Sequence, residues 1–144
     1  MIQAITTKSD MQTMVEISEF VAQNTRNKLV FCNHGIDELH FVNVGFELSV
    51  NLFKSSCDNE SALADVFGKS SYHDKIGSYH AISNIGILFE PELKFNIRNI
   101  FDSYSKNHVL IIQSEAEIQD GKLYFLKHTD HFSVNLQGLS YLIV

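Results

Sequence analysis

Long apolar runs, clustered basic residues and regularly spaced cysteines are all missing from this sequence of 144 residues. Because no run reaches 18 apolar residues, a membrane span is not expected, and the first ten residues lack the basic and apolar stretches of a secretion signal. The two cysteines, Cys32 and Cys57, belong to no CxxC or Cys/His pattern, so both are expected to stay reduced. These absences predict a cytoplasmic protein without a structural disulfide.

The basic residues are too few and too scattered to predict a nucleic-acid-binding protein. The 11 lysines and arginines are outnumbered by 17 acidic residues, which gives a formal net charge of -6. Without a stripe of positive charge that follows a phosphate backbone, counterion release contributes little to binding. We therefore expect no direct contact with DNA or RNA.

What the sequence does contain is enough apolar residues for one α/β domain. Hydrophobic residues make up 44% of the chain and charged residues 19%, so residues 1–144 are expected to form a single domain. Apolar runs predict buried strands at residues 28–32, 81–89 and 109–112, with helical patterns between them. This alternation predicts a mixed, mainly parallel sheet of four or five strands with helices on both faces.

Two helices have recognisable first turns. Ser9 and Gln12 form a capping box ahead of a helix at residues 10–23. Pro91 suits the first position of a second helix, because its fixed φ and missing N–H cost nothing there. The first helix is expected to bury a stripe made of Met11, Met14, Ile17 and Val21.

The connections between the predicted strands are of unequal length. Only residues 33–40 separate the strand at 28–32 from an apolar run at 41–46, which is too short for a crossover helix. The two runs therefore form either a hairpin or a parallel pair with a drastically shortened crossover. Further along, Asp120 and Gly121 are typical of a hairpin turn, and residues 122–126 are the expected return strand of a C-terminal hairpin.

The central strand lacks the charge that nucleotide hydrolysis needs. Where a P-loop ATPase would place acidic residues to hold Mg²⁺, this strand carries Ser83, Asn84 and Gly86. Gly68 and the two residues after it copy the end of a phosphate-binding loop, GxxxxGK[ST], but they follow a helical stretch. We therefore interpret Gly68 as the end of a short helix within residues 61–72 and expect no cofactor.

A metal-dependent nuclease or hydrolase is the enzymatic alternative. Asp74, Glu92 and Lys94 imitate the Asp…GluxLys metal site of restriction-type nucleases, although Glu92 also suits the first turn of a solvated helix. His128 and His131 are the tightest histidine pair, but they fall in an expected loop with no third ligand at a usual spacing. Both sets are more simply interpreted as surface residues, so the protein is not expected to be an enzyme.

Two further sets of residues have a functional and a structural interpretation. Cys32 and His34 flank a strand end and have the chemistry of a nucleophile and a base, but no orienting group is evident, which favours a buried cysteine. Glu115 and Glu117 share one face of a predicted strand, which favours a solvated face.

The chain closes with an apolar strand at residues 139–144 that has no polar tail. Leaving its aliphatic side chains in water would forgo roughly 1.5–3 kcal/mol each, so the segment is expected to be paired. It either completes the sheet as an edge strand or binds a second molecule, and an apolar edge invites such pairing. The candidate interface consists of Tyr141, Leu142, Ile143 and Val144.

Three segments that together span most of the chain point to a known family: residues 44–52, residues 85–94 with the polar residues 105–107 that follow, and residues 120–125 with His131 after them. They resemble the small P-loop-type accessory proteins of bacterial BREX phage-defence systems (BrxF-like). It departs from that family between Phe31 and Phe41, where the phosphate-binding loop and its helix are missing.

The resemblance implies a degenerate P-loop-like fold without Walker motifs. It implies a noncatalytic interaction or regulatory subunit of a phage-defence assembly, in which the former nucleotide-binding fold serves as a scaffold. The implied partners are proteins of the defence complex, together with self-association.

Overall fold

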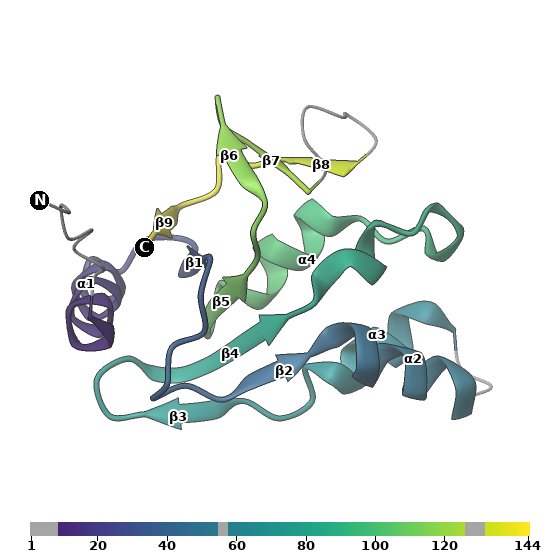
Figure 1. Ribbon diagram of the computed structural model, residues 1–144, viewed down its shortest axis with the longest axis horizontal. Coiled ribbons are helices and arrows are strands. Elements are labelled where there is room, and N and C mark those ends of the chain that lie inside the picture. The colour runs from purple at the N-terminus through teal and green to yellow at the C-terminus, as the bar shows by residue number, and fades with distance from the viewer. Residues whose placement is uncertain (1–8, 55–57, 126–131) are drawn as a thin grey trace, which may run out of the picture.

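A computed structural model describes residues 9–54, 58–125 and 132–144 of the chain (Figure 1). Its main sheet has six strands in the order β2-β4-β5-β1-β9, with β3 paired to the first half of β4. The pairs along this order are all parallel and the β3–β4 pair is antiparallel, so the expected mixed, mainly parallel sheet is confirmed. The strands are β1 (Leu29–Cys32), β2 (Phe41–Asn43), β3 (Ser71–His73), β4 (Gly77–Ser83), β5 (Val109–Gln113) and β9 (Tyr141–Ile143).

A small antiparallel sheet stands above the carboxyl end of β5 in Figure 1. It consists of β6 (Glu117–Gln119), β7 (Lys122–Tyr124) and β8 (Ser133–Asn135). Asp120 and Gly121 turn between the first two strands with φ of 54° and 75°, which confirms the hairpin expected there. β8 was not predicted from the sequence, which indicates a loop at residues 128–133: Ser133 begins this strand, and residues 128–131 lie outside the described residues.

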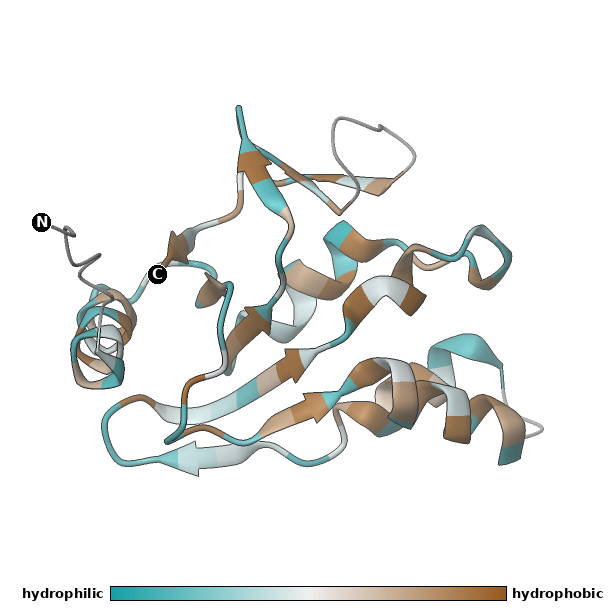
Figure 2. Ribbon diagram, in the orientation of Figure 1, coloured by the Kyte–Doolittle hydropathy of each residue, from teal (hydrophilic) through white to brown (hydrophobic). Residues whose placement is uncertain are grey.

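Helices cover both faces of the main sheet, as expected. One face is covered by α2 (Val44–Lys54), α3 (Asn59–Val66) and α4 (Ile97–Tyr104), and the other by α1 (Asp10–Ala22). The central strands are buried on both sides: Leu110 and Ile112 belong to the first core, whereas Val109 and Ile111 belong to the second. This explains the apolar runs in these strands, and Figure 2 shows the hydrophobic colour on β5 and on the second half of β4.

The first helix begins with the expected capping box, in which Gln12 N–H donates to Ser9 Oγ. Met14 and Ile17 are buried as predicted, but Met11 is 69% exposed and Phe20 is buried in its place. The reason is geometric. Each residue turns the helix by about 100°, and a stripe centred near Ile17 therefore includes Phe20 and excludes Met11.

The connection between β1 and β2 is the drastically shortened crossover, and the hairpin alternative is wrong. β5 and β4 lie between the two strands, which run parallel. Residues 33–40 cross this distance without a helix, and they bury Ile36 and Leu39 in the core beneath α1. Two hydrogen bonds of 2.9 Å hold the crossover, from Asp37 N–H to Asp10 Oδ2 and from His40 N–H to the Tyr79 hydroxyl.

The strand predicted at residues 81–89 is central but shorter than expected. β4 ends at Ser83 because Asn84 adopts the left-handed conformation, with φ of 54°, and the apolar residues after it form the 3-10 helix η1 (Ile85–Phe89). Pro91 takes the first position of a helix as predicted, but this helix is only the 3-10 turn η2 (Pro91–Leu93). Lys94 then adopts the left-handed conformation, and α4 begins separately after its own N-cap, Asn96.

The short helix predicted within residues 61–72 is displaced toward the N-terminus. Asp58 caps α3 by accepting from Ser61 N–H at 2.8 Å, and the helix ends at Val66. Residues from Ser71 onward form β3 instead. No helix among the described residues is long and apolar enough to cross a membrane.

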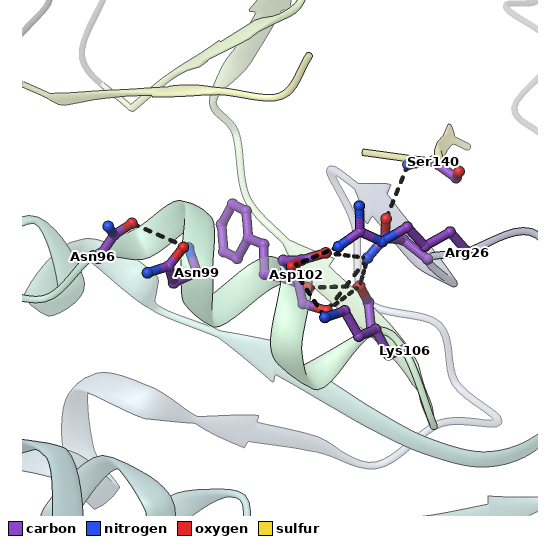
Figure 3. A network of polar contacts seen from close by, with 9 residues as sticks. Arg26, Asn96, Asn99, Asp102, Lys106 and Ser140 are labelled. Atoms are coloured by element: carbon purple, nitrogen blue, oxygen red, sulfur yellow. Dashed lines mark hydrogen bonds and ion pairs between the residues drawn. The ribbon is translucent and has the colours of Figure 1, made fainter. Parts of the chain in front are cut away.

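A buried polar network ties β1, α4 and the approach to β9 together. Asn27 is fully buried and its Nδ2 donates to Asp102 Oδ1 at 2.9 Å and to Ser105 Oγ at 3.0 Å. Its Oδ1 accepts from Ser140 N–H at 3.4 Å. Asp102 also forms ion pairs with Arg26 and Lys106, and Figure 3 shows these groups converging beside the end of α4.

Candidate functional site

The strongest candidate site is a crevice at the carboxyl ends of the parallel strands. Residues that end or directly follow three adjacent strands line it: Asn33 after β1, Ser83 in β4 and Gln113 in β5. It has a volume of about 380 Å³. Ligands of open α/β sheets bind in this position, where chain connections leave toward opposite faces.

The connections around the crevice do diverge in this way. The segment after β1 passes to the face covered by α1, since Ile36 belongs to that core. The segment after β4 passes to the opposite face, because Ile85 and Leu88 belong to the core beneath α2 and α4. The crevice therefore lies at a topological switch point of the sheet.

Some polar side chains of the crevice are already hydrogen-bonded within the protein, and others are not. Asn84 Nδ2 donates to Asn43 Oδ1 at 2.8 Å, and Ser114 Oγ accepts from Ala116 N–H at 3.1 Å. Among the described residues, the side chains of Asn33, Ser83, Gln113 and Glu115 make no hydrogen bond or ion pair with another described residue. These four groups are free to contact a ligand.

A tight contact between α2 and the loop after β4 fixes the shape of the crevice. Gly45 N–H donates to the carbonyl of Asn84 at 3.1 Å, and the Asn43 side chain accepts from Phe46 N–H at 2.9 Å. A Cβ atom on Gly45 would overlap the Asn84 side chain, so the close approach requires glycine. Asn84 is thereby held in its left-handed conformation.

The electrostatics of the crevice do not suit phosphate. Among the described residues of its lining, Glu115 is the only charged one, and no lysine, arginine or histidine is included. Phosphate sites of α/β proteins combine backbone N–H groups with a cation or a metal ion. A carboxylate in their place repels an anionic ligand.

The phosphate-loop-like residues lie elsewhere and confirm the structural interpretation. Gly68 follows the end of α3, where its N–H donates to the carbonyl of Asp65 at 3.2 Å. Lys69 and Ser70 lead directly into β3. No helix begins there, so the geometry that cradles a phosphate is not formed.

The three residues of the nuclease-like set are not brought together. Asp74 lies in the turn between β3 and β4, at the amino end of β4, whereas Glu92 and Lys94 lie in and after η2, beyond the carboxyl end of β4. Within the described ranges, no group of three or more histidine, cysteine, aspartate or glutamate side chains is placed to hold a metal ion. His128 and His131 lie outside the described residues.

Cys32 is the buried cysteine that the sequence favoured. Burial raises the pKa of its thiol to about 12, whereas the neighbouring His34 is exposed. A thiol in that state is not a nucleophile at neutral pH. Cys57 lies outside the described residues. Glu115 and Glu117 are both exposed, as expected of a solvated face.

The C-terminal strand completes the sheet within the chain. β9 pairs in parallel with β1, and Val144 N–H donates to the carbonyl of Phe31 at 2.9 Å. Tyr141 packs toward the core beneath α4, whereas Leu142 and Val144 pack toward α1. Ile143 is 55% exposed, and β9 is the last strand of the sheet. Its outer edge is therefore a second candidate site.

A third cluster surrounds His80 on β4. The ring of His80 contacts those of His108 and Phe67 at centroid distances of 5.1 and 5.3 Å, and Tyr104 completes the cluster. Burial and the nearby His108 lower the pKa of His80. The pKa of Tyr104 is raised, first by burial and then by the nearby carboxylate of Glu60.

We expect the stability of the protein to fall as the pH is lowered from 7 to 5. The unfolded chain binds a proton at His80 near pH 6.5, whereas the folded chain binds it only at a lower pH, so acid favours unfolding. Thermal melting at both values tests this. The substitution His80→Phe should reduce the difference between the melting temperatures at pH 7 and pH 5, and the substitution His34→Gln, at an exposed position, should not. If the wild type and both variants show the same difference, the pH dependence does not come from His80.

Comparison of the chain with protein-family models, with curated proteins and with solved structures gave no significant match. The arrangement of the residues is therefore the basis for inferring what the protein does.

Proposed function

We propose that the protein is a noncatalytic interaction subunit that associates with a second copy of itself through the outer edge of β9. The observation that carries the proposal is a strand edge that pairs with no other described strand and carries an exposed aliphatic residue, Ile143. Because parallel strands alternate their hydrogen-bonding groups, Leu142 and Val144 face β1, and the N–H and C=O groups of Tyr141 and Ile143 face outward.

These outward groups are self-complementary about a two-fold axis. If two copies of β9 pair antiparallel with Leu142 on the axis, Tyr141 of one copy lies opposite Ile143 of the other. Both residues present their hydrogen-bonding groups outward, so each pair exchanges two hydrogen bonds. The contact also sets an aromatic side chain against a β-branched one, a favourable cross-strand pair. A closed two-fold dimer joins the two sheets into one.

Replacing Ile143 with lysine is expected to abolish this association. The side chain is largely exposed, so the substitution leaves the strand in place and puts a charge on the edge. Light scattering should give the wild-type protein, at high concentration, a mass approaching twice 16.4 kDa, and the variant the mass of a monomer. The melting temperatures of the two should agree.

Phe53→Lys is the matched control, because Phe53 is 93% exposed at the end of α2, away from β9 (Figure 1). It should leave the concentration dependence of the mass unchanged. A wild-type protein that is monomeric at every concentration contradicts the proposal, and so does an Ile143→Lys variant that associates as strongly as the wild type.

The noncatalytic part of the proposal is supported by the lining of the strand-end crevice, in which the described residues supply a carboxylate, Glu115, and no cation. We expect ATP, ADP and GTP with Mg²⁺ to leave the melting temperature unchanged, because a ligand that binds the folded state raises it and the described lining offers these anionic ligands no positive charge. Thermal scanning at increasing nucleotide concentration measures this. A shift of several degrees that grows with concentration would show that nucleotide binding survives.

The resemblance to the BREX accessory proteins supports a setting for this interaction, a bacterial phage-defence assembly in which the protein is a scaffold or regulator. The identity of the neighbouring genes tests the setting. A methyltransferase, a large ATPase and a phosphatase-like protein beside this gene would agree with it. An isolated metabolic operon would remove the setting without affecting the dimer.

A further inference from the structure

We infer that the strand-end crevice binds a small uncharged molecule with a planar, amide-like hydrogen-bonding edge, of the nucleobase or nucleoside class. The inference deepens the proposed function, because a ligand bound in the crevice would regulate the interaction subunit. That regulatory role rests on the proposed function. The site itself is argued from the crevice.

The crevice has the size and position of a ligand site. Its volume of about 380 Å³ lies in the range of pockets that enclose small molecules. The ends of β1, β4 and β5 form its base, so the groups that line it are placed by the most buried strands of the sheet. A site on such strands is rigid, which lowers the entropy lost on binding.

Its free polar groups match a heterocyclic base better than other small ligands. Asn33 and Gln113 each offer an amide with one acceptor and two donor positions, and neither amide is used within the described structure. Asparagine and glutamine pair with the adjacent donor and acceptor of an adenine edge through two hydrogen bonds. Ser83 adds a hydroxyl at the end of β4.

One wall of the crevice is flat and apolar. It is formed by Ile85, Gly86 and Phe125, and the Phe125 ring is fixed by stacking on Phe89 at 4.8 Å with an interplanar angle of 15°. A Cβ atom on Gly86 would lie 3.0 Å from the tip of the Phe125 ring, so glycine allows the backbone of residue 86 and this ring to lie close together in the wall. A planar ring can lie against such a wall while its edge reaches the amides.

The same crevice discriminates against phosphorylated ligands. Glu115 supplies a negative charge in the lining, and the described lining residues supply no positive charge to offset it. The formal charge of the whole chain, -6, acts in the same direction. A nucleoside should therefore bind more tightly than its own 5′-monophosphate.

Titration by two-dimensional amide NMR tests the inference with adenosine, guanosine, cytidine, uridine and their 5′-monophosphates. At least one nucleoside should give saturable shifts at Asn33 and Gln113, and its monophosphate should bind about tenfold more weakly. Gln113→Met keeps the length of the side chain and removes its amide, so it should weaken binding by about tenfold or more. Gln119→Met, an exposed position on β6, is the matched control and should bind as the wild type does.

Three outcomes overturn the inference. They are the absence of saturable shifts with every nucleoside, a monophosphate that binds more tightly than its nucleoside, and equal binding by Gln113→Met and wild type. Repeating the titration on the Ile143→Lys variant separates this inference from the dimer. Binding by a wild-type protein that never dimerises rejects only the proposed association, whereas dimerisation without binding rejects only the crevice ligand.

Discussion

Replacing Phe101 with alanine is expected to lower the free energy of unfolding by about 3–5 kcal/mol. Phe101 has no exposed surface and lies on α4 in the core beneath that helix. Its ring meets that of Phe31 on β1 edge to face, with centroids 5.9 Å apart, and so links the helix to the strand that supports β9. Truncation leaves a cavity that rigid strands cannot close.

Urea unfolding measures this loss, with Phe53→Ala as the control. Phe53 is the same residue type on another helix and is almost fully exposed, so its truncation should change stability by less than about 0.5 kcal/mol. Similar stabilities for the two variants would contradict the assignment of Phe101 to the core. Because domains are stable by only about 5–15 kcal/mol, Phe101→Ala is expected to be partly unfolded at body temperature.

Asn27→Ala is expected to cost about 3 kcal/mol, because it removes an amide that makes several hydrogen bonds from a fully buried position. Asn27 is fully buried and bonds to Asp102, Ser105 and Ser140. Its loss therefore weakens the junction of β1, α4 and β9 together.

A second measurement separates this network from simple loss of packing. The hydrogen bond from Asn27 is the largest cause of the lowered pKa of Asp102, ahead of the contributions of Lys106 and Arg26. The pKa of Asp102, followed by NMR, should therefore rise in Asn27→Ala. In Asn99→Ala, at an exposed site on the same helix, both stability and this pKa should be unchanged. An unaltered Asp102 pKa in Asn27→Ala would contradict the network.

The features that could be predicted from the sequence are those set by local patterns. The capping box at Ser9, the turn at Asp120 and Gly121, and the apolar strands at the centre of the sheet all have short-range causes, and all are confirmed. The sequence-based predictions that were wrong concern features determined by tertiary packing. The apolar residues after Asn84 suit a strand by composition, but the left-handed Asn84 ends β4 and they turn into the core beneath α2.

The candidate site could be predicted only in part. The sequence points to Ser83 and Asn84 because charge is missing there, but it predicts no role for Asn33 or Gln113, which also line the crevice. The available signal was that a polar residue directly follows or ends each buried strand. That signal becomes a site only when the strands are known to be parallel neighbours, because the β1–β5 pairing joins segments about eighty residues apart in the chain.

Hydrogen exchange at β9 tests the proposed association most directly. The N–H groups of Leu142 and Val144 face β1, so they should exchange slowly at every protein concentration and serve as an internal control. The N–H groups of Tyr141 and Ile143 face outward, so they should exchange rapidly in dilute protein and slowly in concentrated protein. In Ile143→Lys the amides of residues 141 and 143 should exchange rapidly throughout. Rapid exchange of Tyr141 and Ile143 at all concentrations of the wild-type protein would contradict a role for this edge in binding a second copy.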